Sequence, residues 1–206
     1  MFKLIRVFLI TSVFILITTA CKHYKVAGTK IESSKERIVV PYFNTAGKEY
    51  LYNAKIDVFN NELSGILVVK KLDDKRKRLA LLSEFGNTLL DFEMVNNEVN
   101  VIYIMEDLNK KLIVAKLKKY FQLLVHSNYE IKQTYSFENG SNLVSKLHGK
   151  RIILRNNNNA QLISLQQVSV WREKVKIDFY AEGKHADSIH FKSFEIPVKI
   201  KLRMRK

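Results

Sequence analysis

The sequence is poor in the residues that cross-link or interrupt small folds. One cysteine stands among 206 residues, so a disulfide framework is excluded. Only two prolines and seven glycines interrupt the chain, and no internal repeat or linker is visible. The five histidines show no spacing typical of metal ligands. We therefore expect a single domain without a metal site.

Motifs of the common enzyme classes are absent as well. The chain has no Gly-x-Ser-x-Gly nucleophile elbow, no Walker loop and no glycine-rich dinucleotide turn. Asp187 and Ser188 lie between His185 and His190, which are the residue types of a catalytic triad. Such neighbours in a loop are a common coincidence, so we expect no enzymatic activity and no cofactor.

The one long apolar run lies at the start of the chain. Lys3 and Arg6 precede a charge-free stretch over residues 7–20. A cationic start, a short apolar region and a small residue before the cut are typical of a secretory signal. About 14 apolar residues fall short of the roughly 20 that a membrane-spanning helix needs. The sequence therefore favours a signal peptide over a permanent transmembrane helix.

The only cysteine lies directly after this apolar run. Residues 18–21, Thr-Thr-Ala-Cys, resemble the lipobox of bacterial lipoproteins, although Thr18 replaces the usual Leu, Val or Ile. The resemblance implies that residues 1–20 are removed and that Cys21 carries the covalent lipid. Several acyl chains on one residue would anchor the protein stably. The alternative is a secretory signal followed by an incidental cysteine.

The remaining chain is strongly basic. Loss of Lys3 and Arg6 with the signal takes two of the 35 Lys and Arg, which leaves 33 against 20 Asp and Glu and a formal net charge of +13. This excess favours anionic partners, here lipid head groups or acidic proteins, whereas export argues against nucleic acid. Basic clusters lie at residues 70–71, 75–78 and 116–119. They indicate contact with an anionic membrane surface, and the alternative is an ordinary solvated face.

Short alternating segments dominate the rest of the chain. Residues 21–36 are polar and weakly patterned and are expected to form a lipidated tether, and residues 37–206 the folded domain. Val175, Ile177 and Phe179 alternate with polar residues, and residues 194–204 alternate between apolar and mostly basic side chains. Asn, Asp and Gly pairs separate the segments. This pattern is typical of antiparallel strands joined by hairpins.

One segment, residues 107–126, has a helical period instead. Its apolar residues recur on one side of a helix, and Asp107 is the expected N-cap. The order of elements predicts a mainly β fold, a curved antiparallel half-barrel of about ten or eleven strands with a helical lid on its concave face. A closed barrel with an external helix is the alternative. The apolar residues of the predicted helix are Ile113, Leu117, Tyr120, Phe121 and Leu124.

Three stretches resemble the LolA/LolB family of bacterial lipoprotein-sorting proteins, and LolB, an outer-membrane lipoprotein, in particular. They are residues 54–72, 79–104 and 196–204. The family fold is an unclosed barrel with a helical lid over an apolar cavity, which holds the acyl chains of a passing lipoprotein. The resemblance implies that the apolar face of the predicted helix lines this cavity.

The stretch from Ser83 to Asn87 resembles the LolB loop that projects an apolar residue before a glycine. Phe85 and Gly86 match those two positions, whereas Glu84 replaces the proline of the family. The resemblance implies that Phe85 and Gly86 form a membrane-insertion loop. The alternative is that the Phe85 ring folds back and closes the end of the core.

The resemblance implies a non-enzymatic function. The protein would be a monomeric lipoprotein on the periplasmic face of the outer membrane of a Gram-negative bacterium. It would receive acylated lipoproteins from a LolA-like periplasmic carrier, hold their acyl chains as cargo and deliver them to that membrane. Lys22 is not the aspartate that retains enteric lipoproteins at the inner membrane. The alternatives are a structural or assembly lipoprotein, and a carrier of another amphiphile with the same fold.

Overall fold

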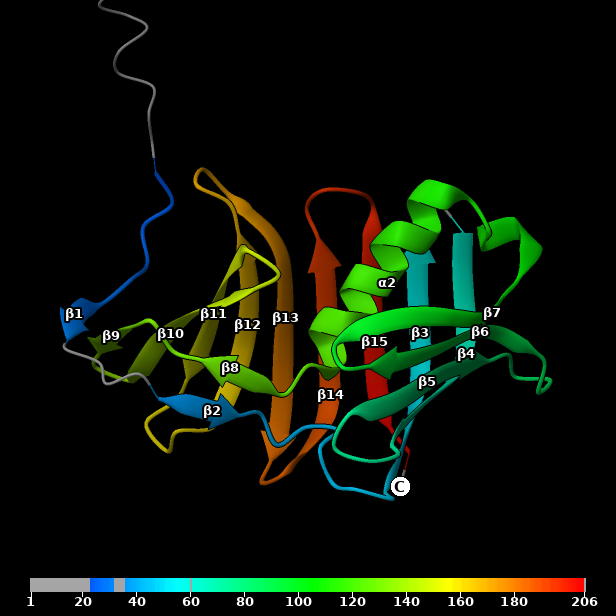
Figure 1. Ribbon diagram of the computed structural model, residues 1–206, viewed down its shortest axis with the longest axis horizontal. Helices are drawn as coiled ribbons and strands as arrows, with labels where there is room; N and C mark the ends of the chain where they lie inside the picture. The colour runs from blue at the N-terminus through cyan, green and yellow to red at the C-terminus, as the bar shows by residue number, and fades with distance from the viewer. Residues whose placement is uncertain (1–22, 32–35, 60, 206) are drawn as a thin grey trace, which may run out of the picture.

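The computed structural model describes residues 23–31, 36–59 and 61–205, so the predicted signal peptide and Cys21 lie outside it. Most of the described chain forms one curved antiparallel sheet of 13 strands (Figure 1). The spatial order of its strands is β1 (Thr29–Ile31), β9 (Gln133–Phe137), β10 (Gly140–Leu147), β11 (Lys150–Asn156), β12 (Leu162–Val168), β13 (Glu173–Glu182), β14 (His185–Ser193), β15 (Val198–Met204), β3 (Glu49–Val58), β4 (Asn61–Lys71), β5 (Arg76–Leu82), β6 (Thr88–Val95) and β7 (Glu98–Ile104).

Strict alternation of side chains builds this sheet. Along β3, every second residue from Tyr50 to Val58 is buried and the residues between them are exposed. This period of two places one face of each strand toward the core and the other toward water. The predicted turn at Asn96 and Asn97 joins β6 to β7, and both residues have a positive φ, of 49° and 72°. Asparagine tolerates this left-handed conformation, which a two-residue hairpin turn requires.

A strand from the early part of the chain pairs with the last strand at the centre of the sheet. β15 pairs with β3, with Ile200 opposite Ile56, while β1 and β7 lie at the two edges. The sheet therefore does not close on itself, which confirms the predicted curved open sheet and excludes the closed alternative. It has more strands than the ten or eleven predicted. One of them, Thr29–Ile31, lies in the segment expected to be a tether and pairs with β9.

In the described part of the chain, one α-helix lies across one face of the sheet (Figure 1). It is α2 (Lys111–Val125), and a 3-10 turn, η1 (Glu106–Leu108), precedes it. Asp107 is therefore not the N-cap: Lys110 takes that position and makes no capping bond with its side chain. Among the described residues, no helix combines the length and apolarity needed to cross a bilayer. A two-stranded sheet of β2 (Arg37–Val39) and β8 (Asn128–Glu130) completes the fold.

The C-terminal end of α2 is held by a buried lysine of β5. Lys77 donates hydrogen bonds to the Val125 carbonyl oxygen at 2.6 Å and to Ser127 Oγ at 3.2 Å. A cation there complements the free carbonyl groups and the negative end of the helix dipole. Burial, with a smaller contribution from the charge of Lys71, lowers the pKa of Lys77 to about 8. This contact fixes the helix to the sheet at one end.

Candidate functional site

An open groove of about 1450 Å³ runs beside α2 on the concave side of the sheet. One wall is the flank of α2 that carries Lys111, Val114 and Lys118. The other parts come from the β6–β7 turn, the β10–β11 turn and the end of β12. His23 and Tyr24, Lys174 of β13 and Glu195 also line it, so the groove joins segments that are far apart in the chain. Its volume exceeds the roughly 300–1,000 Å³ that is typical of small-molecule pockets.

Apolar side chains from both walls supply much of the groove surface. Val114 and Ala115 of the helix and Leu147 and Val170 at the strand ends are partly or largely exposed there. The buried side chains of Leu123, Ile152 and Val168 lie at its base. Such a surface binds hydrocarbon because each methylene group removed from water contributes about 0.8 kcal/mol. The arrangement suits a long flexible chain better than a compact polar ligand. The apolar lining residues are Val99, Val114, Ala115, Tyr120, Leu123, Leu147, Ile152, Val168 and Val170.

Basic side chains are in large excess around the same groove. Two of them, Lys116 and Lys174, contact Glu195 at 2.9 and 3.4 Å. Burial alone would raise the pKa of Glu195, but the hydrogen bonds and charges of these two lysines outweigh it and lower that pKa. The other five make no ion pair with any described residue, so their charge is available to an anionic group. They are Lys111, Lys118, Lys119, Lys150 and Arg151.

The first described residues of the chain border the groove. The Tyr24 N–H donates to the Val170 carbonyl oxygen at 2.6 Å, and the Tyr24 hydroxyl donates to Gln166 Oε1 at 3.3 Å. The His23 ring contacts the Trp171 ring with centroids 5.1 Å apart. Burial and the Glu173 carboxylate raise the pKa of Tyr24. The N-terminal segment is therefore docked on the β12–β13 hairpin at the edge of the groove.

Hydrogen bonds hold the helix wall against the neighbouring turns. Gln122 Nε2 donates to the Asn97 carbonyl oxygen of the β6–β7 turn and to His148 Nε2 of the β10–β11 turn, the latter at 2.8 Å. His126 Nε2 donates to the Asn128 carbonyl oxygen at 2.7 Å, and burial lowers the pKa of this histidine. Of these residues, Asn97, Gln122 and His148 line the groove, so the contacts of Gln122 join its helix wall to two turns.

The predicted helix face does not line the groove as expected. Phe121 packs against Phe92 with centroids 5.4 Å apart, and Tyr120 packs against Phe191 at 5.0 Å. The space directly beneath the helix is thus filled by interlocked core side chains, and the open volume lies beside it. All five predicted residues are buried, but only Tyr120 also contributes to the groove, whereas Ile113, Leu117, Phe121 and Leu124 belong to the core.

Phe85 projects from the turn between β5 and β6. Its side chain is 93% exposed, which contradicts the alternative that the ring closes the core. The turn is held by the Ser83 N–H donating to the Asn87 carbonyl oxygen at 2.8 Å and the Gly86 N–H donating to the Ser83 carbonyl oxygen at 3.0 Å. Gly86 has a φ of +86°, a conformation that glycine adopts readily. An ordered turn therefore presents Phe85 to solvent without help from a proline.

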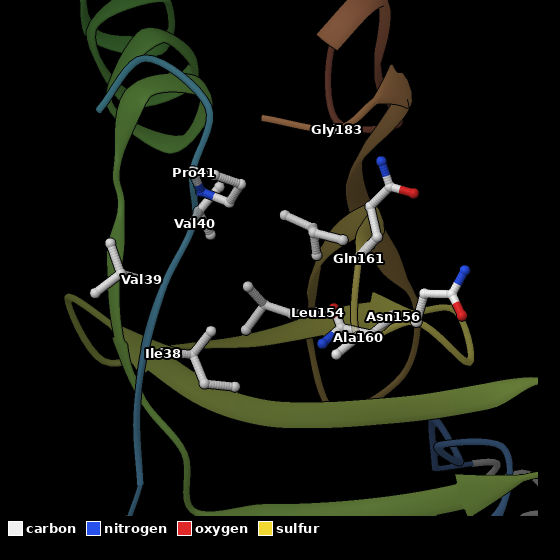
Figure 2. Close-up of a pocket in the computed structure, with 11 residues that line it drawn as sticks. Ile38, Val39, Val40, Pro41, Leu154, Asn156, Ala160, Gln161 and Gly183 are labelled. Atoms are coloured by element: carbon white, nitrogen blue, oxygen red, sulfur yellow. The ribbon is translucent and has the colours of Figure 1, made fainter. Parts of the chain in front are cut away.

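A second hollow of about 330 Å³ lies at the other end of β12 (Figure 2). Ile38 and Val40 line it from one side and Leu154 from the other. Leu162 belongs to this hollow and Val168 to the groove. No described residue lines both spaces, although Leu154 of the hollow and Ile152 of the groove are only two positions apart on β11. The small hollow is therefore distinct from the groove.

Ser188 and His185, two of the triad-type residues in the sequence, have different hydrogen-bond partners. Ser188 Oγ donates to the Leu202 carbonyl oxygen at 3.1 Å, and Lys48 Nζ donates to His185 Nε2 at 2.7 Å. The Ser188 hydroxyl and the His185 ring are therefore each bonded to a different partner and not to one another. Within residues 23–31, 36–59 and 61–205, no cluster of three or more potential metal ligands occurs.

Most groove residues could not be singled out from the sequence. The basic cluster at residues 116–119 was noted, and its lysines line the groove. Tyr24, Lys150 and Val170 carry no local signal, because their association depends on the approach of distant turns. The exposed pair Val170 and Trp171 was likewise missed.

Comparisons with known proteins bear on the fold. No protein-family model matches the chain, and no curated protein matches it. Among solved structures, a LolA superfamily protein of Nitrosomonas europaea superposes with a TM-score of 0.50 at 10% identity, over 80% of this chain and 87% of that one.

Two further structures superpose less well. A DUF1329 family protein of Desulfovibrio piger gives a TM-score of 0.41 at 9% identity, over 80% of this chain and 86% of that one. A domain of Vibrio parahaemolyticus named for outer-membrane lipoprotein sorting gives 0.42 at 5% identity, over 77% and 83%. The protein therefore has a LolA-like fold, a large curved antiparallel sheet that stays open, with one helix across it.

Proposed function

We propose that this protein is an outer-membrane lipoprotein that binds the acyl chains of other lipoproteins in the groove beside α2 and delivers them to the membrane. The observation that carries the proposal is the apolar surface of a 1450 Å³ groove surrounded by unpaired cations. The function is non-enzymatic, because the groove offers binding surface rather than reacting groups.

The apolar surface accounts for binding of the cargo's hydrocarbon. Burial of about ten methylene groups would contribute about 8 kcal/mol before the entropic cost of association. A net binding free energy of about 8 kcal/mol would correspond to a roughly micromolar Kd, so after the cost of association ten methylene groups alone bind more weakly than this, and burial of more of the cargo's hydrocarbon is needed to hold it. The open side of the groove allows a chain to enter and leave without unfolding of the sheet.

The cations account for the polar end of the cargo or of the target. Lys118 and Arg151 lie on opposite walls of the groove and make no ion pair with described residues. An acidic carrier protein or an anionic lipid head group fits this charge. Contacts of this kind weaken as ionic strength rises.

The LolA-like fold supports the proposal, because a neighbour with this fold belongs to the LolA superfamily. The lipobox-like Cys21, the LolB-like turn with Phe85 and delivery from a LolA-like carrier are parts of the same proposal. Lipid on Cys21 would place the groove at the periplasmic surface of the outer membrane.

Site-specific photocrosslinking tests the proposal. A photoreactive amino acid at Ala115, which lines the groove, should capture an acylated lipoprotein. The same probe at Leu112, which is 58% exposed on α2 but not among the residues that line the groove, is the matched control and should capture far less. Cargo whose lipidated cysteine is replaced by serine should not be captured at either position. Equal capture of acylated and unacylated cargo at Ala115 would refute acyl binding.

The basic groove also favours a second candidate, a carrier of another anionic amphiphile. Such a carrier would bind a free fatty acid or a phospholipid in the same place. Depletion of the protein, followed by measurement of where lipoproteins accumulate, separates the two. Retention of lipoproteins at the inner membrane supports the first function, and normal lipoprotein location supports the second.

A further inference from the structure

The tip of the β12–β13 hairpin exposes two large apolar side chains beside the groove. Val170 is 53% exposed and Trp171 is 55% exposed. The exposed part of an apolar side chain at a hairpin tip contributes no burial free energy to folding. Tryptophan is favoured at membrane–water interfaces, where its apolar ring and polar N–H are both accommodated.

The hairpin tip is ordered rather than loose. Ser169 Oγ accepts hydrogen bonds from the Trp171 N–H at 3.3 Å and the Arg172 N–H at 3.1 Å, and the Ser169 N–H donates to the Arg172 carbonyl oxygen at 2.8 Å. The contact between the His23 and Trp171 rings adds a further restraint. A preformed tip loses little conformational entropy when it inserts into another phase.

The first described residues of the chain lie against this tip. Tyr24 is bonded to Val170, and His23 follows Cys21 by two positions. Two extended residues span at most about 7 Å, so an acyl group on Cys21 would be attached close to the hairpin tip. Figure 1 shows the segment before β1 beside the connection between β12 and β13.

Charge around the tip matches an anionic bilayer. Lys150 and Arg151 line the groove beside Val170, and Arg172 lies on the tip itself. Cations near an anionic membrane surface contribute about 1 kcal/mol each. An apolar tip flanked by cations is the arrangement expected of a segment that inserts shallowly among lipid head groups.

We infer that the β12–β13 tip, with Val170 and Trp171, inserts into an anionic membrane surface and directs the open groove toward it. The inference builds on the proposed acyl-binding groove, but it concerns membrane contact and not cargo binding. This membrane contact is separate from the Phe85 turn. In Figure 1 the β5–β6 connection lies at the opposite end of the sheet from β1, whose preceding segment lies beside the β12–β13 tip.

The chain supplies its own probe, because Trp171 is its only tryptophan. The full lipidated chain is reconstituted into vesicles of phosphatidylglycerol and phosphatidylcholine, with or without bromine on the acyl chains of the lipids. We expect brominated lipids to quench the Trp171 emission and aqueous iodide to leave it largely unchanged. Quenching by iodide without quenching by brominated lipids overturns the inference, because it places the tip in water.

Two matched variants separate insertion from general effects of charge. Val170→Glu should abolish quenching by brominated lipids and restore quenching by iodide. Ile102→Glu changes a side chain that is 54% exposed on β7 and should behave like the unchanged protein. Equal effects of both variants would also overturn the inference. Fluorescent fatty-acid binding by the same samples tests the groove separately, so loss of one property without the other is visible.

Discussion

A larger side chain at Ala115 should block the groove without disturbing the fold. Ala115 is an exposed residue of α2 whose methyl group lines the groove, so a phenyl ring added by Ala115→Phe would occupy ligand space. The substitution does not touch the core. The free energy of unfolding should therefore change by no more than about 0.5 kcal/mol, which is usual for surface positions.

The expected loss of affinity follows from the displaced hydrocarbon. A phenyl ring takes the place of about three or four methylene groups of a bound acyl chain, each worth about 0.8 kcal/mol. The loss is then about 3 kcal/mol, or roughly a hundredfold in Kd. Rearrangement of the chain within a groove of 1450 Å³ reduces this value, so it is an upper limit.

Binding of a fluorescent fatty acid by residues 22–206 measures this loss. Leu112→Phe is the control, because Leu112 is equally a residue of α2 but does not appear on the groove surface. It should leave Kd unchanged. Unaltered binding by Ala115→Phe, or the same loss for both variants, would show that hydrocarbon binds elsewhere. Absence of any saturable binding by the unchanged protein would refute the acyl-binding groove itself.

Three further predictions concern charge, the exposed turn and pH. Lys118→Glu should weaken binding of an anionic fatty acid by about 2 kcal/mol, which is roughly thirtyfold in Kd, and high salt should reduce this difference. Lys201→Glu, on the outer face of the sheet, should bind the fatty acid normally. Titration of both variants at two salt concentrations measures these effects. Phe85→Glu should keep the melting temperature but stop release of lipoprotein to vesicles, and unimpaired transfer would remove Phe85 from the site. Lys77 has a folded pKa of about 8, below its unfolded value of 10.5, so the unfolded state binds more protons between these values. Its contribution to the free energy of unfolding should rise with pH across that window, by up to about 3 kcal/mol, and denaturant titrations of Lys77→Met should lack this rise.

Alternation and helical spacing were sufficient to predict the class of fold. The helix begins at Lys111 rather than Asp107, because Leu108 is drawn into the core and residues 106–108 form a separate turn. β1 was missed because all three of its residues are exposed, so no alternation marks it. The signals that succeeded are those in which burial repeats along the chain.

The alternating pattern at the end of the sequence is longer than the strand that forms there. Residues 194–204 alternate throughout, yet β15 begins at Val198. Ser193 Oγ accepts hydrogen bonds from the Glu195 and Ile196 N–H groups, which bends the chain before the strand. Pro197 directly precedes this central strand, where its missing N–H leaves no ladder donor absent.

The groove itself could not be predicted in this way. Its walls come from turns that are distant in sequence, and their meeting depends on the curvature of the whole sheet. Exposure of Phe85 was equally undecidable, because an aromatic residue in a polar turn can face either way. Local sequence predicted the elements, whereas the empty space between them is a property of their assembly.

The pairing of β15 with β3 has a consequence for how the chain reaches its folded state. Val198 meets Val58, so one flank of β3 has no partner until the chain has been synthesised as far as β15, roughly 140 positions later. Contacts between such distant segments slow folding, and an unpaired strand flank invites aggregation. During that interval a chaperone that covers the free flank of β3 would protect the chain.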